Sequence, residues 1–285
     1  PAVELGHVDV YAAKPVFGTL TVQEFQYGLE VTEYDALEGV VPSAASPPWT
    51  EIISGAGLGS SAMVAGLFQL VDNDYGTGAL QGARVERRAI ATFGANIGAT
   101  VEARFLISSW SNQAGNQEPL EPISAGFVID DGTERAQLMF VQTLYGKYVY
   151  LPGLDAAQSL TDVLIQNVAG QAISASVSFD QIHTYRLEKK PGQYIKLFID
   201  DAASPSVTLT WDVVGGFDIP ATLGVGSGIL FGSMDLSRKS ASSWKRCVFS
   251  AGNGYDLAVR PALAESERNN VFDTVSEVIL HAEGI

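Results

Sequence analysis

Apolar and polar residues alternate with a period of two through the central part of the chain, which is typical of half-buried β-strands. In residues 100–108 (TVEARFLIS), Val101, Ala103, Phe105 and Ile107 fall on one face, and charged side chains fall on the other. Because successive side chains of a strand point to opposite faces of its sheet, we predict that the apolar face lies in a core.

Turn residues divide the alternating segments into hairpins. Residues 190–193 (KPGQ) fit a type II turn, because Pro fixes φ at the second position and Gly accepts a positive φ at the third. This turn makes residues 183–200 the clearest hairpin, and residues 125–130 and 136–142 form another around a turn at 131–132. Further short strands are predicted at residues 207–211 and 229–232. Many short strands with Gly-rich turns favour an all-β sandwich or barrel.

The two ends of the chain depart from this pattern. We predict an N-terminal arm at residues 1–34, a sandwich at residues 35–250 and a C-terminal docking tail at residues 251–285. The tail spaces its apolar residues like one face of a helix, but its β-branched residues also suit a strand, so both forms stay open. Either form has an apolar face that needs a partner, which is its own sandwich or another chain. Residues 1–11 lack a basic stretch followed by an apolar run, and we therefore expect synthesis in the cytosol without a signal peptide.

The charge balance of the chain excludes several partners. Of 285 residues, 17 are Lys or Arg and 32 are Asp or Glu, which gives a formal net charge of -15. Binding to nucleic acid or to an anionic membrane needs clustered Lys and Arg, so we expect neither partner. The single cysteine, Cys247, excludes a disulfide within the chain and a cysteine-based zinc site.

Several segments of the chain, in order, resemble one known fold. They are residues 33–50 (EYDALEGVVPSAASPPWT), 101–107 (VEARFLI), 125–132 (AGFVIDDG), 185–200 (YRLEKKPGQYIKLFID) and 231–248 (FGSMDLSRKSASSWKRCV). Together they resemble the concanavalin A-like lectin/glucanase jelly roll in its laminin G-like form, from residue 35 to about residue 250. The resemblance implies a jelly-roll β-sandwich. It leaves the function open, because lectins, glycosidases, adhesins and structural modules share this fold.

One acidic motif matches a catalytic signature of that fold. Glu33, Asp35 and Glu38 fit E-x-D-x-x-E, the signature of the laminarinase-type retaining glucanases. In a retaining glycosidase one carboxylate attacks the sugar and the other protonates the leaving oxygen, at a separation of about 5 Å. The motif falls at the start of the predicted sandwich, and Ala36 and Leu37 replace the β-branched residues expected in a buried strand. We therefore predict an ordinary first strand and no enzyme, with a glycosidase as the alternative.

Metal and cofactor sites have weak sequence support. His7, His183 and His281 are scattered and give no metal-binding spacing. We predict no cofactor, and calcium is the alternative, because relatives of this fold bind it through loop carboxylates. The acidic candidates are Asp72-Asn73-Asp74, Asp130-Asp131 and Asp200-Asp201. Each also lies where a turn favours Asp or Asn, and none comes with a full ligand set.

Sugar binding requires an exposed aromatic ring beside polar side chains, because the ring face stacks on sugar C–H groups. Trp110 is the best candidate, in a segment rich in Ser, Asn and Gln (residues 108–117). Tyr145 and Tyr148, on either side of Gly146-Lys147, form a second candidate. The other tryptophans, Trp49, Trp211 and Trp244, are expected in the core or at a sheet rim.

These observations lead to one functional hypothesis and two alternatives. The hypothesis is a non-enzymatic virion protein, such as a phage head decoration, fibre or tail component, that binds host-surface glycans. It is expected to form a homo-oligomer and to contact other virion subunits through its arm and tail. The alternatives are a secreted glycoside hydrolase or lyase that acts on polysaccharide, and an extracellular bacterial adhesin.

Overall fold

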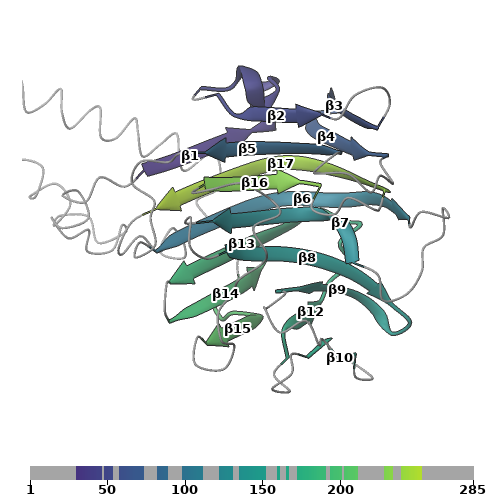
Figure 1. The fold of residues 1–285 in the computed structure, drawn as a ribbon, viewed down its shortest axis with the longest axis vertical. Coiled ribbons are helices and arrows are strands. Elements are labelled where there is room, and N and C mark those ends of the chain that lie inside the picture. Colours follow the sequence, from purple (N-terminus) through teal and green to yellow (C-terminus); the bar gives the residue numbers. More distant parts are fainter. Residues whose placement is uncertain are drawn as a thin grey trace, which may run out of the picture. The chain divides into compact units, whose positions relative to one another are not determined.

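The fold is a two-layered antiparallel β-sandwich, seen in a computed structural model (Figure 1). The structure describes residues 30–46, 48–53, 58–73, 82–88, 98–111, 122–130, 135–151, 159–160, 165–166, 172–190, 193–200, 202–210, 228–233 and 239–251. The predictions for residues 1–29 and 252–285, most of the arm and the tail, lie outside these residues.

The described strands fall into two large sheets. Sheet A has the order β15 (Val207–Thr210), β14 (Tyr194–Ile199), β13 (His183–Lys190), β6 (Ala99–Ser111), β17 (Lys239–Ala251), β4 (Leu67–Asp72) and β3 (Gly59–Val64), and β1 (Glu30–Asp35) also pairs with β17. Sheet B has the order β12 (Ser174–Ser176), β9 (Gly146–Tyr150), β8 (Arg135–Thr143), β7 (Pro122–Asp130), β16 (Gly228–Gly232), β5 (Ala83–Arg88) and β2 (Thr50–Ile53).

The remaining described elements are small. β10 (Ser159–Leu160) pairs with β11 (Ile165–Gln166), and two 3₁₀ turns, η2 (Ala36–Glu38) and η3 (Pro42–Ala44), come after β1. Neither of these two turns is long and apolar enough to cross a membrane. The described part of the chain therefore confirms the predicted all-β class.

The predicted alternation places the core between the two sheets. Val101, Ala103, Phe105 and Ile107 of β6 are completely buried, as the period of two predicts. Facing strands of sheet B contribute their own inward residues to the same cluster, including Phe127 of β7. Burying one such side chain contributes roughly 1.5–3 kcal/mol, so this layer is the main source of stability.

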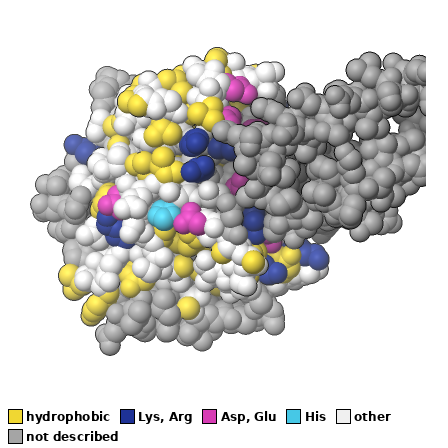
Figure 2. All heavy atoms as spheres, turned by 180° about the vertical axis from the view of Figure 1, so that it is seen from behind, with side chains coloured by type: hydrophobic (Ala, Val, Ile, Leu, Met, Phe, Trp, Pro, Cys, Tyr) yellow, Lys and Arg dark blue, Asp and Glu magenta, His cyan; other side chains and the backbone are white. Residues whose placement is uncertain are grey.

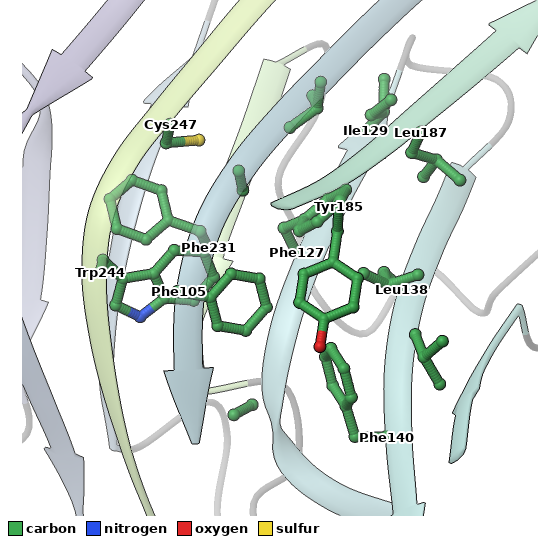
Figure 3. Close-up of a cluster of buried hydrophobic side chains, with 14 of the residues drawn as sticks. Phe105, Phe127, Ile129, Leu138, Phe140, Tyr185, Leu187, Phe231, Trp244 and Cys247 are labelled. Carbon is green, nitrogen blue, oxygen red and sulfur yellow. The ribbon is translucent and has the colours of Figure 1, made fainter. Parts of the chain in front are cut away.

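Aromatic rings fill the centre of that layer (Figure 3). The indole of Trp244 stacks on Phe105 with 3.9 Å between ring centroids, and Phe231 lies 4.6 Å from it on the other sheet. The indole Nε1 donates to Ser242 Oγ over 2.8 Å. Trp244 is therefore a core residue with its one polar atom paired, as the sequence predicts.

A β-bulge in β17 keeps Trp244 and Cys247 on the same face. A register shift between Trp244 and Arg246 leaves Lys245 unpaired against β6, and Cys247 then lies opposite Ala103. Without the shift, residues three apart would point to opposite sides. Cys247 is completely buried, and this burial raises the pKa of its thiol.

Both predicted hairpins are confirmed by strand pairing within the described residues. In β13–β14, Leu187 lies opposite Leu197, and the Gln193 N–H donates to the Lys190 carbonyl over 3.0 Å, as a four-residue turn requires. β7 pairs with β8 so that Asp130 lies opposite Arg135. The short strands predicted at residues 207–211 and 229–232 correspond to β15 and β16.

Candidate functional site

One end of the sandwich brings together aromatic, amide and charged side chains from distant parts of the sequence. The segment after β12 connects the sheets there, because the Ile107 N–H donates to the Phe179 carbonyl over 2.8 Å and the Val177 N–H donates to the Lys147 carbonyl over 3.0 Å. We define the rim site by its side chains: Trp110 of β6, Gln142 of β8, Lys147 of β9, and Phe179 and Asp180.

A bulge in β6 turns Trp110 toward this end of the core. Simple alternation would place Trp110 on the outward face with Leu106. The register against β17 shifts, however, so that Ile107 lies opposite Ser242 and Ser109 lies opposite Ala241. The extra residue reverses the facing of the last residues of β6, and the partly buried Trp110 packs against the core, edge-on to Phe179 at 5.0 Å.

Lys147 covers these two rings. It lies two residues before the buried Val149 in β9 and so points to the same side. Its ammonium is 5.3 Å from the centre of the Trp110 ring and 5.4 Å from that of Phe179, within the range of a cation–π interaction. The same ammonium lies 2.5 Å from Asp180 Oδ2, and its hydrogen bond lowers the pKa of that carboxyl group.

Unpaired polar atoms gather around this end of the core. Among the described residues, the buried atoms without a hydrogen-bond partner include Trp110 Nε1, Gln142 Oε1, His183 Nε2 and Tyr185 Oη. Gln142 lies directly opposite Lys147. An unpaired buried polar group costs about 1–3 kcal/mol, so each of these atoms calls for an explanation.

Aromatic contacts link these atoms through the core. The ring of Phe140 lies 5.6 Å from Phe179 and 5.2 Å from Tyr185, and the ring of Tyr185 lies 6.1 Å from His183. Phe140 also precedes Gln142 by two residues on the inward face of β8. A continuous row of ring contacts therefore runs from Trp110 through Phe179, Phe140 and Tyr185 to His183.

The tip of the β8–β9 hairpin holds an exposed ring near the rim site. Tyr145 is 55% exposed and Leu144 is 76% exposed. Thr143 Oγ1 accepts from the Tyr145 N–H over 3.0 Å and donates to the Gly146 carbonyl over 3.2 Å, which holds the turn in place. The prediction of a second exposed ring is wrong for Tyr148: it is 4% exposed, because it pairs with Val141 inside sheet B and offers no open face.

The acidic motif near the start of the sandwich is divided between two elements. β1 ends at Asp35, whose Oδ1 accepts from the Leu37 N–H over 2.8 Å at the start of η2. Glu33 remains on the strand, where its Oε1 accepts from Arg246 Nε over 2.6 Å, and Glu38 lies in η2. The three carboxylates do not share one strand face, and the segment is the first strand that the sequence predicts.

The acidic residues considered for calcium have protein partners. Asp72 accepts from Ser233, Asp130 pairs with Arg135, and Asp200 accepts from the Thr184 N–H and lies 2.6 Å from His183 Nδ1. In the part of the chain that the structure describes, no group of three or more His, Cys, Asp or Glu residues is placed to hold a metal ion. The second acidic residues of these sets, Asp74, Asp131 and Asp201, lie outside the described residues.

The sequence analysis did not assign Gln142, Lys147 or Asp180 to a site. A signal was present for two of them, since Gln142 and Lys147 occupy inward positions in line with Phe140 and Val149. A polar residue at an inward position near a strand end indicates an open end of a core. Asp180 carried no such signal, because only the folded chain brings it to Lys147, 33 residues away.

The chain is similar in fold to solved carbohydrate-related structures. An endo-1,3-beta-glucanase from Streptomyces sioyaensis is 12% identical over 79% of this chain and 96% of its own, with a TM-score of 0.44. The Emp46p carbohydrate recognition domain in its metal-free form is 14% identical over 76% and 94%, with a TM-score of 0.42. The CBM2 module of the evolved Dit of Lactobacillus casei BL23 phage J-1 is 11% identical over 84% and 95%, with a TM-score of 0.39.

The likeness is one of fold. Two antiparallel sheets with the core between them confirm the predicted all-β sandwich. No family model and no curated protein matches the chain.

Proposed function

We propose that this protein is a non-enzymatic carbohydrate-binding module and that the sugar binds at the rim site. The observation that carries the proposal is the set of buried, unpaired polar atoms beside aromatic rings, in particular Trp110 Nε1 and Gln142 Oε1. The first is a donor and the second an acceptor. A sugar hydroxyl both donates and accepts, so hydroxyl groups are suitable partners for either atom.

The surroundings of these two atoms suit the rest of a sugar ring. Trp110 is only partly buried and offers part of its ring to sugar C–H groups, and the Lys147–Asp180 pair offers a donor and an acceptor to a neighbouring hydroxyl. Tyr145, on its fixed hairpin tip, is exposed for a further sugar unit of a longer glycan. Trp110 and Tyr145 therefore keep their predicted role within the proposal, and Tyr148 loses it.

The test removes the indole donor while keeping an aromatic ring. Trp110→Phe is expected to weaken binding to the oligosaccharide found on a glycan array about tenfold, the loss of one hydrogen bond from a buried donor. Trp49→Phe is the matched control, because Trp49 is also buried with an unpaired Nε1 but packs on Phe231, outside the rim site. Equal effects of the two substitutions, or no binding to any glycan, would contradict the proposal.

The placement of this module in a virion is the second part of the proposal. Its support is the acidic, single-cysteine composition together with a lectin-like sandwich. Light scattering with mass spectrometry on protein purified from its source is expected to find it in a large particle with capsid or tail proteins. A small monomer secreted alone would overturn this part and leave the sugar-binding part standing.

The enzyme alternative has its own test. Wild-type protein and Glu38→Gln are incubated with β-1,3-glucan, and released reducing sugar is measured. Because Glu38 lies in η2 while Glu33 pairs with Arg246 on β1, we expect no hydrolysis by either protein. Hydrolysis that Glu38→Gln abolishes would establish the glycosidase.

A further inference from the structure

The strand β3 forms one edge of sheet A. It pairs only with β4 (Figure 1), and no backbone hydrogen bond from another part of the described chain reaches its other side. Such an edge offers unpaired N–H and C=O groups to a further strand, and proteins usually protect it with charged residues, a proline, a bulge or a short strand. β3 has none of these features, because its sequence is GSSAMV, it has six residues and its register with β4 is unbroken.

The turn after β3 decides which backbone groups face the open edge. Ala65 and Gly66 form a two-residue turn with φ of 51° and 76°, and Val64 and Leu67 flank it as a pair. In such a hairpin the flanking pair exchanges both of its hydrogen bonds. Val64 and every second residue before it therefore bond to β4. The residues between them direct their N–H and C=O groups to the open edge: Gly59, Ser61 and Met63.

This edge is complementary to itself. When two copies of β3 run antiparallel with Ser61 opposite Ser61 of the second copy, Met63 lies opposite Gly59, and the open N–H and C=O groups of both strands meet. On the outward face of sheet A, Val64 then lies opposite Leu58. No charged side chain meets another in this register, so it lacks the like-charge contacts that destabilise a strand pair.

The charges of the chain favour this edge over the others for contact between two copies. With a formal net charge of -15, two copies repel each other where their carboxylates meet. β1, which also pairs on one side only, carries Glu30, Glu33 and Asp35, and β2 carries Glu51. β12 and β15 have only three and four residues. Among these edge strands of the described chain, β3 therefore offers the longest uncharged edge.

Exposed apolar side chains lie beside this edge. Val64, at the end of β3, is 47% exposed, and Ile53 of β2 is 37% exposed. β2 is next to β3, because Ser61 Oγ donates to Glu51 Oε2 over 2.8 Å. In the view of Figure 2, hydrophobic and uncharged atoms make up most of the described surface at the top of the molecule, where Figure 1 places β3. Burial of this apolar surface adds to the main-chain hydrogen bonds of a paired edge.

We propose that two copies of this protein associate through β3, so that their A sheets join into one continuous sheet across a twofold axis at Ser61. A twofold axis closes the assembly at a dimer, because it uses the same edge on both subunits. The interface contains no residue of the rim site. The dimer carries two rim sites, but its formation does not depend on the carbohydrate binding proposed above.

The first experiment measures association of the full chain by sedimentation velocity over a wide range of protein concentration. Wild type is expected to form a dimer. Ala62→Lys places a charge on the outward face of each β3 near the axis and is expected to raise the dissociation constant about tenfold. Thr208→Lys is the matched control, because it adds the same charge at an exposed position of β15, the opposite edge of sheet A, and should leave the dissociation constant unchanged.

The second experiment tests the register. Ser61→Cys places a thiol on the axis, where paired Cα atoms are about 5.5 Å apart, within the range that a disulfide spans. Mild oxidation is expected to link this variant into a dimer on a non-reducing gel. Wild type should stay unlinked, because its single cysteine, Cys247, is completely buried. Thr208→Cys should also stay unlinked, as an exposed thiol on the other edge.

The outcomes decide the proposal. A wild-type dimer that Ala62→Lys weakens, Thr208→Lys leaves unchanged and Ser61→Cys links supports it. A monomer at all concentrations overturns it, as does a dimer that Ala62→Lys leaves as tight as wild type or that both lysine substitutions weaken equally. A thermal unfolding curve confirms that each variant is folded before its association is compared. Glycan binding is read separately, so a failure of the dimer leaves the proposed function standing.

Discussion

Two tryptophans in this protein occupy opposite situations within one apolar layer. Trp244 lies at the centre, completely buried, stacked on Phe105, with its Nε1 paired to Ser242. Trp110 lies at one end, partly buried, edge-on to Phe179 beneath the ammonium of Lys147, with its Nε1 unpaired. Both rings face inward from sheet A.

The two tryptophans differ in whether the indole N–H has a hydrogen-bond partner within the chain. Trp244 satisfies its indole N–H within the chain, so that group needs no further partner. The end of the layer leaves Trp110, Gln142, His183 and Tyr185 with buried atoms that no described group pairs. A core is most stable when its polar atoms are paired. Unpaired polar atoms at one end of the core therefore indicate a surface that binds another molecule.

The largest expected effect is on stability at the centre. Trp244→Ala is expected to lower the free energy of unfolding by about 3–5 kcal/mol, because it removes a fully buried ring and leaves a cavity. Trp110→Ala, at the end of the layer, should lower it by roughly half as much, since less of its surface is buried. Urea unfolding followed by circular dichroism measures both. Equal losses of unfolding free energy in the two variants would contradict the difference between the centre and the end of the layer.

A smaller effect is expected from hydrogen bonding alone. Ser242→Ala leaves the buried Nε1 of Trp244 without an acceptor and should lower the free energy of unfolding by about 1–3 kcal/mol. Tyr185→Phe removes a hydroxyl that is already unpaired and should leave that free energy unchanged or raise it slightly. The same urea curves decide between these outcomes. A loss in Tyr185→Phe as large as in Ser242→Ala would mean that Tyr185 Oη has a partner in solution.

The smallest effect concerns the ion pair over Trp110. Because the folded-state pKa of Asp180 is lowered, its contribution to stability is present above the unfolded-state value of about 3.9 and is lost as the pH falls through the folded-state value. The pair is partly exposed, so we expect wild type to exceed Asp180→Asn by less than about 1 kcal/mol at pH 7. Thermal unfolding is measured from pH 7 to pH 2. The stabilities of wild type and Asp180→Asn are expected to converge only at the acid end of this range. A constant difference down to the lowest pH would argue against the ion pair.

Part of the molecule could be predicted from local patterns. The inward positions of β6 follow from alternation between Val101 and Ile107, and the β13–β14 hairpin follows from its Pro-Gly turn. The acidic motif was correctly interpreted as a first strand, because its residue types and its place in the chain did not suit a buried cleft. Such features depend on residues that are neighbours in the sequence, and steric rules act on them directly.

The sequence by itself determined the all-β class and the main hairpins, because period and turn chemistry are local properties. Only the tertiary structure decided the rim site. The facing of Trp110 depends on a bulge set by register against β17, and the burial of Tyr148 depends on its place within sheet B. Asp180 reaches Lys147 only after the segment following β12 has crossed between the sheets. Register and long-range closure arise from the whole packed structure, and no single segment encodes them.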